Sequence, residues 1–189
     1  VVNNMAALRG YYKNYNKQAL NWYKNQVTQL GDLNKLKILG DNVKYQQSKP
    51  SVGSFCLYFY SSKGYQEGTL SYYDAFPLVC MLDMDAKYCQ GLNFHYLPPR
   101  ERLLLLQQII SIQGGNFSEA KKLEVTYDLI KTATNLYKPT FHKYFINRIK
   151  SKVVVVPIES IVPAVFLPVA SWKGNSQTAV WKDSKAKIS

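Results

Sequence analysis

The sequence predicts an α+β protein: a small antiparallel sheet or SH3-like barrel, with helices inserted between its two halves and a helical arm at the N-terminus. Two apolar segments, residues 76–84 and 91–97, are joined by a short charged turn at 83–87, which is typical of a pair of neighbouring strands. Pro98 and Pro99 then end the sheet and open a helix, because proline cannot donate to a strand ladder but fits the first helical turn. A β-branched run at 153–158 predicts a return to strand near the C-terminus.

Residues 1–50 form the predicted arm. Residues 4–30 have the periodicity of an amphipathic helix with an aromatic face beside a basic face, and the polar, lysine-rich residues 32–50 have the composition of a linker. The aromatic face is our candidate protein interface, although packing on the protein's own core would produce the same pattern. Its residues are Tyr11, Tyr12, Tyr15, Trp22 and Tyr23.

The rest of the chain, residues 51–189, forms the predicted α+β domain. Strands are expected within 52–60 and 69–73, on either side of a glycine-containing loop at 61–68. The helix after Pro99 carries four consecutive leucines, residues 103–106, and is apolar on more than one face, which predicts burial between the sheet and another element. Gly114 and Gly115 break the pattern before a second helix at 118–136.

A third, short helix is expected at 141–152, with aromatic and aliphatic residues on one side and cations on the other. The inserted helices therefore span about residues 98–152. After the strand at 153–158, residues 159–166 form a helical or single-turn connector. Residues 167–173 are expected to form a strand that turns at Gly174 and Asn175, so that residues 178–182 pair back as a hairpin.

Charge separates these parts. The 189-residue chain carries 24 basic and 12 acidic residues, for a net charge of +12. Residues 1–50 account for +6 and residues 116–152 for +5, whereas residues 51–115 carry −1. A strongly basic protein favours an anionic partner, most often nucleic acid, although an acidic protein, a membrane surface or solubility alone also accounts for such charge. The candidate nucleic-acid-binding residues are Arg9, Lys13, Lys17, Lys24, Lys143, Arg148, Lys150 and Lys152.

The sequence offers little support for catalysis, and we expect neither an enzyme nor a cofactor or metal site. His95 and His142 lie near no cysteine or serine nucleophile motif, and Asp83 with Asp85 supplies too few oxygen ligands for a divalent ion. Residues 119–121 match the E-x-K half of a metal-dependent nuclease signature, but they open a predicted helix rather than lie on a strand. The three cysteines show no zinc spacing and are expected to be reduced and buried. No stretch approaches the ~20 apolar residues of a membrane span.

Three segments resemble a block in structural proteins of T-even-like tailed bacteriophages, in the group of DNA end protector or head-completion proteins. These are LYFY at 57–60, TLSYYDAFPLV at 69–79 and GLNFHYLPP at 91–99. The resemblance extends over about residues 55–182 and is best at 69–99. It transfers no catalytic residues, because the matching positions have the pattern of core and turn.

The resemblance implies a virion protein that is made in the host bacterial cytoplasm and added to a filled head. There it would bind at the head-neck region, alongside portal, neck or tail subunits, and contact or protect packaged double-stranded DNA ends without sequence specificity. A symmetric ring or homo-oligomer is the expected assembly in the particle. The alternative is a neck, tail or baseplate component engaged only in protein-protein contacts.

Overall fold

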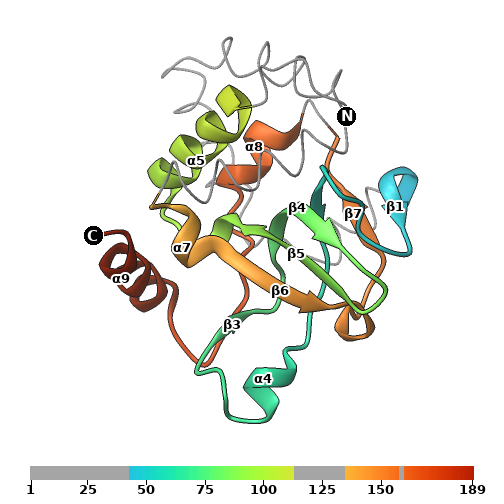
Figure 1. The fold of residues 1–189 in the computed structure, drawn as a ribbon, viewed down its shortest axis with the longest axis horizontal. Coiled ribbons are helices and arrows are strands. Elements are labelled where there is room, and N and C mark those ends of the chain that lie inside the picture. The colour runs from blue at the N-terminus through green and yellow to red at the C-terminus, as the bar shows by residue number, and fades with distance from the viewer. Residues whose placement is uncertain (1–42, 113–134, 158–159) are drawn as a thin grey trace.

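The computed structural model describes residues 43–112, 135–157 and 160–189 (Figure 1). Nearly all of the predicted arm and of the predicted helix at 118–136 lies outside these ranges. The described elements, in chain order, are η1 (Val43–Tyr45), β1 (Gln46–Gln47), β2 (Phe55–Leu57), α4 (Lys63–Gln66), β3 (Tyr73–Asp74), β4 (Leu78–Met84), β5 (Tyr88–Asn93), η2 (Phe94–Tyr96), α5 (Pro99–Ile112), α7 (Tyr137–Thr140), β6 (Phe141–Phe145), η3 (Ile146–Arg148), β7 (Val153–Val155), α8 (Ile161–Phe166), β8 (Trp172–Lys173) and α9 (Gln177–Ile188). The η elements are 3₁₀ helices.

A six-stranded antiparallel sheet organises the described chain, with strand order β1-β7-β2-β4-β5-β6, and β3 pairs with β8 in a separate two-stranded sheet. This arrangement confirms the α+β class. The strands form an open sheet, with β1 and β6 at its edges, and not a closed barrel.

The predicted strand pair is the centre of the sheet, as β4 and β5. Val79 lies opposite Asn93, and Gly91 lies opposite Met81. Gly91 is required here, because a Cβ atom at this position would lie 2.3 Å from the Cys80 carbonyl oxygen. The second strand covers 88–93 rather than 91–97, since the Asn93 side chain accepts a hydrogen bond from the His95 backbone N–H and starts the 3₁₀ helix η2.

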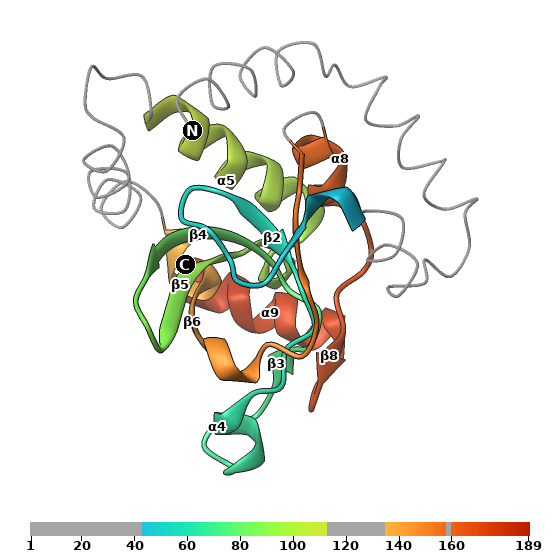
Figure 2. The same cartoon turned by 90° about the vertical axis from the view of Figure 1, so that its right-hand side faces the viewer.

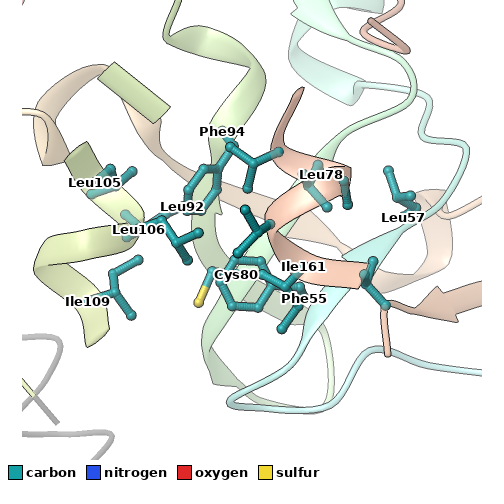
Figure 3. Close-up of a cluster of buried hydrophobic side chains, with 14 of the residues drawn as sticks. Phe55, Leu57, Leu78, Cys80, Leu92, Phe94, Leu105, Leu106, Ile109 and Ile161 are labelled. Atoms are coloured by element: carbon teal, nitrogen blue, oxygen red, sulfur yellow. The ribbon is translucent and has the colours of Figure 1, made fainter. Parts of the chain in front are cut away.

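Helices α5 and α8 cover one face of the sheet, and α4 lies at the opposite end of the molecule (Figures 1 and 2). Helix α5 begins at Pro99, as predicted. It buries Leu105, Leu106 and Ile109, whereas Leu104 is 44% exposed, so the helix is buried on one face only. The core between these layers, shown in Figure 3, includes Phe55, Leu78, Cys80, Leu92, Phe94, Leu105, Leu106, Ile109 and Ile161.

The other face of the sheet carries a second, aromatic cluster. Tyr58, Tyr60 and Tyr144 meet edge to face within it, with ring centroids 5.0–6.5 Å apart. Cys56 and Cys89 also lie in this cluster. All three cysteines of the chain are free and buried, as predicted.

Two predicted elements are wrong. Residues 141–152 form no α-helix: Phe141–Phe145 is the edge strand β6, which pairs with β5, and a 3₁₀ helix and extended chain follow it. The backbone groups at the edge of β5 favour a strand here, and aromatic residues are enriched in strands. The predicted hairpin strand at 178–182 is part of helix α9, which Ser176 caps by accepting a hydrogen bond from the Ala179 N–H. Only Trp172–Lys173 of the predicted strand at 167–173 is strand.

Candidate nucleic-acid interface

The start of β5 and the end of β6 carry two aromatic rings beside two lysines. Tyr88 and Phe145 are cross-strand partners, with ring centroids 4.9 Å apart and a 59° angle between the ring planes. The Lys143 ammonium lies 4.3 Å from the Tyr88 ring centroid, and the Lys63 ammonium, from α4, lies 6.0 Å from the Phe145 ring centroid. Both rings are half-buried and both lysines are exposed. We call these four residues the basic aromatic platform.

Helix α4 holds one side of the platform in place. The Ser62 side chain caps it by accepting a hydrogen bond from the Tyr65 N–H. Arg148 donates a 2.6 Å hydrogen bond to the Gln66 side-chain oxygen, which connects η3 to α4. The platform's Lys63 also forms a 3.5 Å ion pair with Glu67, but both side chains are about half exposed. Exposed pairs of this kind contribute only about 0–1 kcal/mol, so a phosphate group can compete for the lysine.

The segment that follows β6 carries three more of the cations that the sequence identified, Arg148, Lys150 and Lys152. It lies against the chain after β2, through a bridge between Tyr60 and Ile149 and a backbone hydrogen bond from the Lys150 N–H to the Phe59 carbonyl. Lys150 and Lys152 are exposed, and Arg148 is half-buried. The four predicted cations of residues 143–152 therefore lie along a strand, a 3₁₀ turn and the segment after it, and not on one α-helix face. The structure brings Arg148 to α4 and Lys143 to the Tyr88 ring on β5, and it places Lys150 and Lys152 farther along the chain.

Two carboxylates border the platform at the turn between β4 and β5. Asp85 accepts hydrogen bonds from the backbone N–H groups of Lys87 and Tyr88, and these bonds lower the pKa of its carboxyl group. Asp83 accepts a hydrogen bond from the Gln90 side chain. Both carboxylates thus shape the turn. Within the described ranges, no group of three or more potential metal ligands occurs. The charges of Lys143 and Lys87 also lower the pKa of Asp85, so cations partly offset the negative charge of this turn.

Residues of the GLNFHYLPP segment, 91–99, take part in a buried polar network. The Asp74 carboxylate lies 2.6 Å from His95 Nδ1, and both side chains are fully buried. Asp74 also accepts hydrogen bonds from the N–H groups of Phe76 and Ser171 and from the Asn93 amide. Burial by itself raises the pKa of Asp74, but the His95 charge and these hydrogen bonds lower it overall. The pair therefore connects β3 to β5 and η2 and has a structural role.

A cavity of about 50 Å³ opens beside this network. Tyr60, Tyr73, Tyr96 and Tyr144 line it, and Asp74 forms part of its wall. It has room for a few water molecules but not for a nucleotide, since each water needs about 10–15 Å³ of such a cavity. This cavity therefore offers no site for a nucleotide.

Sequence reasoning did not identify three of the platform residues. Phe145 was expected on the apolar side of a helix, and Lys63 and Tyr88 were not singled out. Only the pairing of β5 with β6 brings Tyr88 to Phe145, and only the position of α4 brings Lys63 to them. The one local sign of this surface in the sequence was Tyr88, an aromatic residue directly after the charged turn at 83–87. The candidates in the arm, both cations and aromatic residues, lie outside the described residues, so their roles stay predictions.

The fold and this surface define a basic α+β protein that displays cations and aromatic rings at the edge of an open antiparallel sheet. A comparison with protein families matches residues 9–185 to the phage T4 terminal DNA protecting protein family. The chain therefore belongs to this family of bacteriophage proteins that protect DNA ends, which confirms the resemblance found in the sequence. Comparisons with curated proteins and with solved structures gave no significant match. None of the helices in the described ranges combines the length and apolarity that a bilayer crossing requires.

Proposed function

We propose that this protein is a non-enzymatic component of the phage particle that binds the ends of packaged double-stranded DNA and shields them from exonucleases. The observation that carries the proposal is the family match over residues 9–185, which extends across almost the whole chain. The exposed cations at and after the platform support it physically, because lysine and arginine side chains neutralise phosphate groups.

Binding of this kind is indifferent to base sequence. Phosphate contacts fix the position and orientation of a protein on duplex DNA but carry no sequence information. Each phosphate that is neutralised contributes about −0.9 to the slope of log affinity against log salt concentration. If Lys143, Arg148, Lys150 and Lys152 each engage one phosphate, they contribute about −3.6 to that slope.

The proposed location is the head-neck region of the virion, where the protein would contact the end of the packaged DNA together with portal, neck or tail subunits. A homo-oligomer or symmetric ring around the DNA exit suits this position, because it would surround the DNA end. The protein would be made in the host bacterial cytoplasm and added after packaging. Chemical cross-linking of purified particles, followed by mass spectrometry, tests this location. Cross-links only to distal tail or baseplate proteins would contradict it.

Binding and protection can be measured together on a linear duplex. The K143Q/R148Q/K150Q/K152Q variant is expected to reduce the salt slope by about 3–4 and to lose protection against a processive double-strand exonuclease. The matched control is R100Q/K173Q/K182Q/K185Q, which removes the same charge from exposed positions on α5, β8 and α9. The control should keep most of the protection.

Two outcomes would contradict this proposal. If the wild-type protein does not bind linear duplex even at low salt, DNA-end binding fails for the isolated chain, and a purely protein-binding role in the neck, tail or baseplate becomes the better hypothesis. If both variants lose binding equally, net charge rather than this surface accounts for the interaction.

A further inference from the structure

We propose that the basic aromatic platform stacks on an unpaired base at the DNA end, so that the protein prefers an end with exposed bases to continuous duplex. This inference rests on the proposed function and adds the chemical feature that would be recognised. Within a duplex, base faces are covered by their neighbours, and only phosphates and groove edges face the outside. An overhanging or frayed end exposes a base face that an aromatic ring can cover.

The two rings are held in place before any ligand binds. Tyr88 follows a turn that Asp85 closes by accepting hydrogen bonds from the backbone. The Phe145 backbone N–H donates to the Tyr60 hydroxyl, which itself belongs to the buried aromatic cluster. A base that binds to such a surface immobilises few additional protein groups, which reduces the entropic cost of binding.

The angle between the rings determines how a base can bind. Because the ring planes lie 59° apart, a base that stacks face to face on one ring meets the other ring with its edge. Both contact types are favourable for aromatic groups. One unpaired base at a time therefore fits this arrangement better than a run of stacked bases does.

Charge favours a nucleotide over an apolar protein segment as the occupant. Lys63 and Lys143 lie beside the rings, and Arg148 donates a hydrogen bond to the helix that carries Lys63. Asp83 and Asp85 lie in the turn before Tyr88, where Asp85 is in the field of the Lys143 and Lys87 charges. A base on the rings would thus have its phosphate within reach of these cations. Lys143, which lies over the Tyr88 ring, has a flexible stem that can move to a phosphate when a base takes its place.

The test measures the affinity of the 189-residue chain for three DNA probes. They are a duplex with a short single-stranded overhang ending in 2-aminopurine, a blunt duplex of equal length, and a closed dumbbell duplex without ends. The wild-type protein is expected to bind the overhang most tightly and to quench 2-aminopurine fluorescence, since stacking quenches this base. Replacing both rings, Y88L/F145L, should weaken overhang binding by about tenfold or more and leave dumbbell binding unchanged.

The chain offers a matched control at the opposite edge of the sheet. Tyr45 is also half-buried, with the Lys44 ammonium 4.7 Å from its ring centroid, but it stands apart from the platform, next to β1. Y45L should therefore leave overhang binding unchanged. If the double platform variant does not fold, as judged by its melting temperature, Y88L alone serves the same comparison.

The outcomes separate this inference from the proposed function. If the wild-type protein binds all three probes with equal affinity and Y88L does not alter these affinities, the stacking inference is contradicted but DNA binding is not. Equal weakening of all three probes in Y88L would also contradict it, because the ring would then support the surface rather than contact a base. Failure of the wild-type protein to bind any probe would contradict the proposed function itself and favour a protein partner for this surface.

Discussion

His142 is expected to make the protein less stable in mild acid. Its ring on β6 stacks on Tyr96, with 4.0 Å between ring centroids and 28° between ring planes, and its Nε2 lies 3.0 Å from the Pro139 carbonyl oxygen. Burial lowers the pKa of the imidazole from 6.5 to about 4, with the Lys187 charge acting in the same direction. The hydrogen bond to Pro139 and the Asp74 charge oppose this shift but do not cancel it.

The sign and size of the effect follow from proton binding. Between about pH 4 and 6.5 the imidazole is protonated in the unfolded chain and neutral in the folded protein. The unfolded state therefore binds more protons, and the free energy of unfolding falls as the pH falls through this window. At about 1.4 kcal/mol for each pKa unit, the loss reaches about 3 kcal/mol at pH 4, a large part of the stability of a typical domain.

Urea denaturation of the wild-type protein and the H142F variant at pH 7, 6, 5 and 4.5 tests this prediction. Phenylalanine keeps the ring on Tyr96 but loses the hydrogen bond to Pro139, which costs about 1 kcal/mol at pH 7. Because phenylalanine does not titrate, the variant should become more stable than the wild-type protein near pH 4.5. Parallel pH profiles for the two proteins would refute the assignment of a neutral, half-buried imidazole at this position.

Two substitution pairs test the core and the central strand pair by urea denaturation. L105D should abolish folding, because an unpaired carboxylate in a dry core costs several kcal/mol. L104D should change the free energy of unfolding by less than about 0.5 kcal/mol, since Leu104 is 44% exposed. Equal stability of the two variants would show that α5 does not pack as described. G91A should destabilise the protein severely, because its Cβ would lie 2.3 Å from the Cys80 carbonyl oxygen. At Gly68 a Cβ meets nothing within 4 Å, so G68A should cost only the strain of its positive φ, about 1 kcal/mol. A smaller loss of unfolding free energy for G91A than for G68A would contradict the register of β4 and β5.

The sequence identified part of the candidate site and missed the rest for a physical reason. Lys143, Arg148, Lys150 and Lys152 were found because they are concentrated in a short stretch of chain, which net charge alone reveals. The spatial arrangement was wrong, since strand pairing with β5 replaces the expected helix face. Tyr88 and Lys63, which join Lys143 and Phe145 in the platform, come from other parts of the chain, and no local pattern connects them.

The sequence by itself determined the features that depend on neighbouring residues. Pro99 starts α5 because proline needs no hydrogen-bond partner at a first helical position, and the apolar, β-branched segments around Val79 and Val154 became paired strands. The phage resemblance also came from a local string, GLNFHYLPP, whose His95 and Asn93 bind Asp74 in the buried network.

Tertiary structure alone decided the features that depend on distant partners. Residues 141–145 could alternate as a strand or place the same aromatic residues on a helix face, and the edge of β5 selected the strand. The adjacent residues Leu104 and Leu105 of α5 differ in burial because only Leu105 faces the sheet. Lys63, Tyr88 and Phe145 form one surface only because sheet pairing and the position of α4 bring them together. Backbone pairing and burial depend on which segments meet in space, and this information is absent from any short stretch of sequence.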